Sequence, residues 1–309
     1  MKDTFVTGGK PLPAYIVTGP TSGIGRRAAL ELARHGQVIL VGRDPQKLAA
    51  VQKTIQRRGQ VAVTVVCDLS DPGSVRKAAT EIAALDLPVA GVLNNAGIFP
   101  LKPAKARNGW DLAFTTNHLG PFAFTEALRP HLGDGTTVVF VASAVEDPER
   151  QVAVAAGFRG SRYISAAASA RGEWNPGGAT MPGADAYASS KQAILAAALE
   201  FARETPRLNF LALEPGFTPN TGLGRGASFV LRLLTHAILP LFALFMPYWS
   251  TPKRAGHVAA QIVLNRQRAT GVYFNEKGRP MDPSARVRQP DFGRQVVAET
   301  RALLSEVKE

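Results

Sequence analysis

Short apolar runs alternate along much of the chain with longer segments in which apolar residues recur every three or four positions. A short apolar run is typical of a buried strand in a parallel sheet, and the longer period is typical of an amphipathic helix. The pattern predicts strands at residues 14–18, 37–41, 61–67, 89–93, 136–142 and 208–213. It predicts helices at residues 26–35, 45–58, 74–85 and 186–204.

Strands and helices that alternate at this spacing form right-handed βαβ units, in which helices cover both faces of a parallel sheet. The expected fold class is therefore α/β, with a single doubly wound Rossmann domain over residues 1–309. Two segments depart from the pattern. Residues 146–184 are rich in Ala, Gly, Ser and Pro and form an insertion, and the apolar residues 227–249 are expected to form a helical substrate lid.

Composition narrows the classes of function only slightly. The net charge of +12 comes from Arg and Lys residues scattered along the chain, so no nucleic-acid partner is expected. The single cysteine, Cys67, excludes an internal disulfide and a cysteine-based zinc site; no metal is expected, and a cytoplasmic location is favoured. Residues 1–13 lack the apolar segment of a secretory signal.

A glycine-rich loop follows the first predicted strand and precedes the first helix. Glycines at positions 19, 23 and 25 allow a tight turn and a close approach of the backbone to a pyrophosphate at a helix N-terminus. An ordinary glycine-rich turn is the alternative, and the context between strand and helix favours the phosphate loop. The residues assigned to it are Gly19, Thr21, Ser22, Gly23, Ile24 and Gly25.

The end of the second strand bears on the choice of cofactor. Arg43 supplies a planar, permanent charge that suits the 2′-phosphate of NADP. Asp44 is interpreted as a helix N-cap before Pro45, although an inward-facing Asp44 would favour NAD. NADP(H) is therefore the expected cofactor, ahead of NAD(H).

Tyr187 and Lys191 stand four residues apart at the start of the long predicted helix, so they share one helix face. A neighbouring ammonium favours the phenolate and fits Tyr187 for general acid/base chemistry. The pattern is common by chance, and a solvated Tyr/Lys face is its ordinary interpretation. Other motifs in the chain favour the catalytic interpretation of this pair.

Together the motifs resemble those of the short-chain dehydrogenase/reductase family, over roughly residues 14–221. They occur in the family's order: Thr18-Gly19, Gly23-Ile24-Gly25, Asp68-Leu69, Asn94-Asn95-Ala96-Gly97, Asn117, Ser143, Tyr187 with Lys191, and Pro215-Gly216.

The resemblance implies a role for each matched position. Tyr187 would be the general acid/base, Lys191 would hold the nicotinamide ribose, Ser143 would bind the substrate oxygen, and Asn117 would support a water. The other implied cofactor contacts are Asp68, Leu69, Asn95, Ala96, Gly97, Pro215, Gly216, Thr218 and Thr221. The ordinary alternatives are a helix cap for Asn117 and a turn residue for Ser143.

The insertion separates Ser143 from Tyr187 by more residues than is usual in the family, and so should lie beside the mouth of the active site. The chain looks similar to the branch that contains retinol dehydrogenases and protochlorophyllide reductases. Cys67 falls within a predicted strand, so the activity of the latter is not carried over.

The leading hypothesis is an NADP(H)-dependent oxidoreductase that interconverts a hydrophobic alcohol and its aldehyde or ketone. The alternatives are a reductase of a conjugated C=C bond and a non-catalytic NADP(H)-binding regulator. The apolar character of residues 227–249 indicates a bulky apolar substrate and leaves open a peripheral contact with a membrane surface. The resemblance also implies a homo-oligomer.

Overall fold

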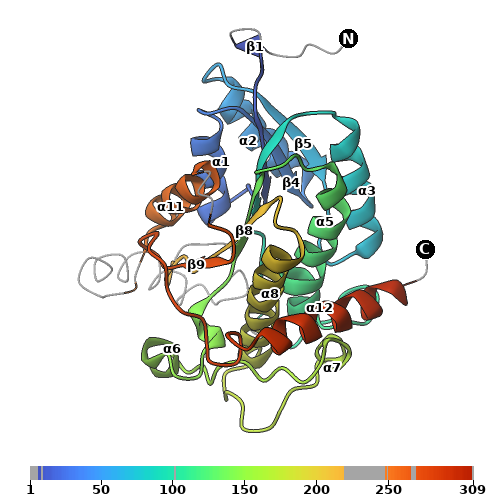
Figure 1. Ribbon diagram of the computed structural model, residues 1–309, viewed down its shortest axis with the longest axis vertical. Coiled ribbons are helices and arrows are strands. Elements are labelled where there is room, and N and C mark those ends of the chain that lie inside the picture. The colour runs from blue at the N-terminus through green and yellow to red at the C-terminus, as the bar shows by residue number, and fades with distance from the viewer. Residues whose placement is uncertain are drawn as a thin grey trace.

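The computed structural model describes residues 6–7, 10–100, 102–218, 248, 250–265 and 269–307. Within these ranges, seven strands form one parallel sheet in the order β5-β4-β3-β6-β7-β8-β9, and a separate two-stranded sheet joins β1 to β2. Because β3 pairs with β4 on one side and with β6 on the other, the strand order reverses between β3 and β6. This arrangement is a doubly wound Rossmann fold (Figure 1).

The strands are β1 Val6–Thr7, β2 Lys10–Pro11, β3 Ala14–Thr18, β4 Gln37–Gly42, β5 Ala62–Val66, β6 Val89–Asn94, β7 Thr137–Val141, β8 Asn209–Leu213 and β9 Val272–Phe274. The helices are α1 Gly23–Leu32, α2 Pro45–Gln56, α3 Pro72–Ala84, α4 Leu112–Phe114, α5 Gly120–Leu128, α6 Gln151–Ala155, α7 Ala166–Arg171, α8 Ala184–Glu204, α11 Pro252–Leu264 and α12 Pro290–Ser305. A π-helical turn, Thr115–Leu119, joins α4 to α5, and 3-10 turns occupy Arg129–His131 and Ala144–Glu146.

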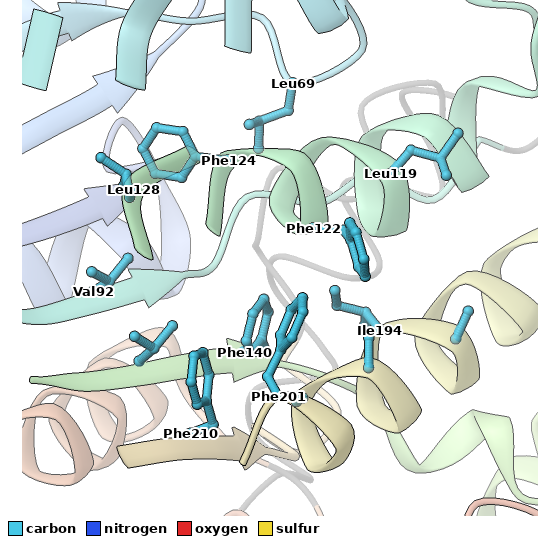
Figure 2. Close-up of a cluster of buried hydrophobic side chains, with 14 of the residues drawn as sticks. Leu69, Val92, Leu119, Phe122, Phe124, Leu128, Phe140, Ile194, Phe201 and Phe210 are labelled. Carbon is cyan, nitrogen blue, oxygen red and sulfur yellow. The ribbon is translucent and has the colours of Figure 1, made fainter. Parts of the chain in front are cut away.

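Two apolar cores lie on opposite faces of the sheet. Alternate strand residues point to opposite faces, so Ile16 joins the core beneath α3, α5, α8 and α12, whereas Val17 joins the core beneath α1, α2 and α11. In the first core the rings of Phe122 and Phe201 lie 5.0 Å apart (Figure 2). Burial of these side chains fixes α8 against β7 and β8 and so places the residues at the start of α8.

The α/β fold class is confirmed, and each predicted strand and helix has a counterpart within a few residues. The sequence pattern did not predict β9, α5, α11 or α12, nor the short elements β1, β2, α4, α6 and α7. The three-residue β9 is too short to give a pattern. Gly120 and Pro121 lie at the start of α5, directly after the π-helical turn, and hide its helical signal.

The two unusual segments have different outcomes. Most of the predicted lid, residues 227–249, and the predicted cofactor contact Thr221 lie outside the described residues. The insertion contains the short helices α6 and α7, and α7 packs against the C-terminal helix α12 (Figure 1). Among the described residues, no helix combines the length and apolarity that would be required to cross a membrane.

Candidate active site

The glycine-rich loop lies at the carboxyl end of β3, beside the point where the strand order reverses. Ligands of open α/β sheets bind outside the carboxyl ends of the strands at such a point. Gly19 has a φ of +67°, which favours glycine. A Cβ on Gly25 would lie 2.3 Å from the carbonyl oxygen of Gly19, so only glycine lets α1 start this close to the loop. The backbone is therefore shaped as a phosphate-binding turn requires.

Thr18 and Asn95 join this loop to the end of β6. The Thr18 hydroxyl accepts hydrogen bonds from the backbone N–H groups of Asn95 and Ala96, both at 3.0 Å. In return, Asn95 Nδ2 donates to the carbonyl oxygens of Thr18, at 2.9 Å, and Gly19, at 3.3 Å. These bonds hold two of the predicted cofactor-binding segments side by side.

Arg43 and Asp44 follow β4 next to the same loop. The carboxylate of Asp44 accepts a hydrogen bond from the backbone N–H of Lys47 at 3.1 Å, and it pairs with the Lys47 ammonium at 2.7 Å. Asp44 is therefore the N-cap of α2, as predicted. Arg43 is exposed and forms no ion pair within the described part of the chain, so its guanidinium is available to an anionic ligand.

Asn117 lies in the π-helical turn Thr115–Leu119, and its side chain is buried. Its Oδ1 accepts from the backbone N–H of Ile98 at 2.8 Å, while Nδ2 donates to the Ile98 carbonyl at 2.9 Å and to Ser190 Oγ at 3.1 Å. Ser190 Oγ donates in turn to the carbonyl of Tyr187 at 2.7 Å. The turn thus ties the segment after β6 to the first turns of α8.

Tyr187 and Lys191 lie on one face of α8, with the ammonium nitrogen 5.7 Å from the centre of the phenol ring. The Ser143 hydroxyl, beyond the end of β7, is hydrogen-bonded to Tyr187. Lys191 Nζ donates to the carbonyl oxygen of Val141 at 2.7 Å. A Cβ on Gly97 would lie 3.5 Å from this nitrogen. Ser143, Tyr187 and Lys191, three of the four predicted catalytic side chains, therefore form one group. Asn117 is linked to this group through Ser190 Oγ, which is hydrogen-bonded to the carbonyl of Tyr187.

Burial controls the acidity of the pair. It lowers the pKa of Lys191 to about 8, against an opposing effect of the Glu214 carboxylate. Burial also raises the pKa of Tyr187, and the charge of Glu214 adds to this effect, while the hydrogen bond with Ser143 opposes it. In this structure the Lys191 ammonium is directed to Val141, and the phenol is held protonated.

The remaining predicted contacts lie around the same edge of the sheet. Asp68 Oδ1 accepts from both the backbone N–H and the hydroxyl of Ser70, at 3.0 and 2.7 Å, so part of its carboxylate shapes a turn. The Leu69 side chain belongs to the core. Beyond β8, Thr218 Oγ1 donates to the carbonyl of Gly216 at 3.0 Å.

Four residues near Tyr187 were not predicted. The rings of Phe99 and Phe158 lie 5.0 and 6.4 Å from the ring of Tyr187, and they lie 5.9 Å from each other. The Glu214 carboxyl acts on the catalytic pair, and the charge of Arg150 acts on Glu214. Glu214 directly precedes the predicted Pro215-Gly216, which was the one signal that could have found it; no pattern in the insertion identifies Phe158 or Arg150.

This fold and site define an α/β protein of the dinucleotide-binding class. Comparison with known proteins is consistent with it. Residues 13–156 match the family model described as short chain dehydrogenase. The chain is 30% identical over 267 residues to the short-chain dehydrogenase/reductase pkfC of Emericella nidulans, covering 75% of this chain and 78% of that protein. The chain therefore belongs to the short-chain dehydrogenase/reductase family, whose members are oxidoreductases.

Two further similarities concern part of the chain or the fold alone. Human retinol dehydrogenase 13 is 37% identical over 144 residues, or 43% of each chain. The chain thus matches less than half the length of several curated relatives. The solved structure of the angucycline C-6 ketoreductase LanV with bound NADP has a TM-score of 0.63 and 21% identity, over 86% of this chain and 94% of LanV, a likeness of fold.

Proposed function

We propose that this chain is an NADP(H)-dependent oxidoreductase that interconverts a hydrophobic alcohol and its aldehyde or ketone, with Tyr187 as the general acid/base. The observation that carries this proposal is the grouping of Ser143, Tyr187 and Lys191 outside the carboxyl ends of the strands, with Asn117 behind them. A solvated Tyr/Lys pair has no need of a hydrogen-bonded serine partner or of a tied asparagine.

The proposed roles follow from the positions of these side chains. The nicotinamide would supply or accept the hydride. Tyr187 would give a proton to the substrate oxygen during reduction and take it back during oxidation. The Ser143 hydroxyl would bind the same oxygen and orient it, and the Lys191 ammonium would favour the phenolate when it faces Tyr187. Asn117 would hold the segment after β6 in register with α8.

The preference for NADP(H) has two supports. The loop at Gly19 and the start of α1 fit a pyrophosphate, and the exposed Arg43 lies where a 2′-phosphate would need a cation. LanV, a protein of the same fold, has NADP bound. The residues present therefore fit this cofactor.

The preference for an apolar substrate is supported by the aromatic side chains around Tyr187. Phe99, from the segment after β6, and Phe158, from the insertion, are both half-buried and flank the phenol ring. Such side chains bind apolar and aromatic groups well. A relative named retinol dehydrogenase 13 is consistent with a substrate of this kind.

A direct test is NADPH consumption against a panel of apolar aldehydes, ketones and enones, with NADH run in parallel. We expect oxidation of NADPH with a bulky apolar carbonyl, and an alcohol as the product. Analysis of the product from an enone separates carbonyl reduction from reduction of the C=C bond. NADPH binding without turnover of any member of the panel would contradict the proposed activity and favour a cofactor-binding regulator.

A further inference from the structure

Glu214 is a buried carboxylate directly beyond β8, next to the catalytic group. It is 9% exposed. Leu213, the preceding residue, pairs with Val141 at the end of β7, so Glu214 and Ser143 leave adjacent strands at nearly the same height. A buried carboxylate is costly unless its oxygens are hydrogen-bonded or a cation lies near, so its partners indicate what it does.

Both oxygens of Glu214 are used, and they reach two different loops. Oε2 accepts a hydrogen bond from the backbone N–H of Ala144, the residue after Ser143. Oε1 accepts from the backbone N–H of Gly216 at 2.9 Å, in the segment of the implied cofactor contacts Pro215, Gly216 and Thr218. One side chain therefore connects the loop of the substrate-binding serine to a cofactor loop.

The charge of Glu214 faces the catalytic pair from β8. It raises the pKa of both Tyr187 and Lys191. Burial raises the pKa of Glu214 itself. The hydrogen bonds from Ala144 and Gly216 and the charge of Arg150, from the insertion, lower this pKa, and the charge of Glu276 raises it. Tyr273 on β9 is a further titratable group near this carboxyl.

The Arg150 side chain is held at this position by an aromatic ring. Its guanidinium lies 5.4 Å from the ring centre of Tyr248, and the Tyr248 carbonyl accepts from the backbone N–H of Phe217, next to Gly216. The insertion thus supplies a cation to the loop that Glu214 holds.

We propose that Glu214 is a positioning residue for the reaction, which ties the Ser143 loop to the Gly216 loop and sets the field at Tyr187 and Lys191, with Arg150 as its counter-ion. This inference rests on the proposed role of Tyr187. It gives the insertion a part in the chemistry in addition to its part in binding the substrate.

The test is the pH dependence of kcat/KM in both directions for wild type, E214Q, R150M and the double variant. Loss of the carboxylate charge lowers the pKa of Tyr187. The limb of the pH profile that reports the ionisation of Tyr187, called the Tyr187 limb, should therefore move to lower pH by about one unit in E214Q. R150M keeps both hydrogen bonds of Glu214 but removes the cation that offsets its charge, so it should move the limb to higher pH. In the E214Q background the same substitution should move the limb by less.

A matched control and a second readout make the result specific. E276Q removes another buried carboxylate nearby, one that does not act on Tyr187, and should not lower the limb. Ultraviolet titration of the phenol, taken as the difference from Y187F, should show the same shift without turnover. Unmoved limbs in both folded E214Q and R150M would overturn the role of Glu214. Full activity of Y187F would instead overturn the proposed function.

Discussion

At the scale of single residues, the site depends on how burial and charge adjust ordinary side chains. Lys191 is almost fully buried, and its ammonium is satisfied by the Val141 carbonyl at 2.7 Å. Arg43 is the opposite case, because it is exposed and its charge stays available. Each of these residues leads to a prediction that concerns the cofactor.

Lys191 predicts how cofactor affinity depends on pH. Its pKa is lowered to about 8, so the ammonium is present below that pH and is lost above it. If the ammonium holds the nicotinamide ribose, the Kd of NADP⁺ should rise as the pH passes through about 8. Calorimetric titration of wild type and K191M tests this: K191M should bind more weakly and without that rise. A wild-type Kd that stays level across this pH would contradict it.

The exposed charge of Arg43 leads to a prediction about the preference for NADPH over NADH. Removing a cation that is hydrogen-bonded to a phosphate costs about 1.5–3 kcal/mol, so R43A should lower kcat/KM for NADPH by roughly tenfold to a hundredfold. The value for NADH should change little. R57A is the matched control. It replaces an exposed arginine at the end of α2 and should leave both values unchanged. An equal loss with both cofactors would mean that Arg43 does not read the 2′-phosphate.

At the scale of elements, the insertion is the part that distinguishes this site. It places the Phe158 ring 6.4 Å from the Tyr187 ring and Arg150 near Glu214. Its middle is anchored by Tyr163, whose hydroxyl donates to Glu299 of α12 at 2.6 Å. The insertion is thus fixed to α12 by this hydrogen bond and places Phe158 and Arg150 at the active site, as a segment that determines substrate specificity should.

Phe158 predicts selectivity for apolar substrates. Loss of one aromatic contact is worth about 0.5–1.5 kcal/mol beyond the buried area, so F158A should raise KM for a bulky apolar carbonyl by about tenfold. KM for a small carbonyl should stay near its original value. I164A, in the same insertion, is the control and should leave the ratio of the two KM values unaltered. If F158A leaves this ratio unaltered too, the ring does not contact the substrate.

At the scale of the whole molecule, distant parts of the chain meet behind the site. His118, next to Asn117 in the π-helical turn, is fully buried and hydrogen-bonded to Thr300 of α12 at 2.8 Å between Nε2 and Oγ1. Burial lowers its pKa to about 3, so His118 is neutral near neutral pH. The C-terminal helix therefore supports the turn that carries Asn117.

This contact predicts an effect on stability. T300V keeps the shape of the side chain but leaves a buried histidine nitrogen unpaired, which should lower the free energy of unfolding by about 1–3 kcal/mol. Denaturant unfolding followed by circular dichroism measures it. T54V is the matched control. Thr300 Oγ1 also donates to the Val296 carbonyl one turn back, at 2.6 Å, and Thr54 makes the same kind of bond to Ala50, at 2.9 Å, on a partly exposed helix. Similar losses in the two variants would show that the link to His118 contributes nothing.

Sequence reasoning recovers the parts of this protein that depend on local patterns. The positions of six strands follow from alternating apolar runs, and Gly19, Tyr187 and Lys191 stand at spacings that their chemistry requires. Contacts between distant segments leave no such pattern. Glu214 is unremarkable until β8 lies beside β7, and Phe158 reaches Tyr187 only through the path of the insertion. Thr300 likewise acquires its role from packing alone.

The central claim is that Tyr187 is the proton donor and acceptor for the reaction, and Y187F tests it most directly. The substitution removes one hydroxyl and keeps the ring beside Phe99 and Phe158. The measurement is NADPH oxidation with the best carbonyl of the panel, alongside NADPH binding by calorimetry, in wild type and Y187F. We predict that turnover falls by at least about a hundredfold, while the Kd of NADPH changes little. Turnover by Y187F at the wild-type rate would contradict the account.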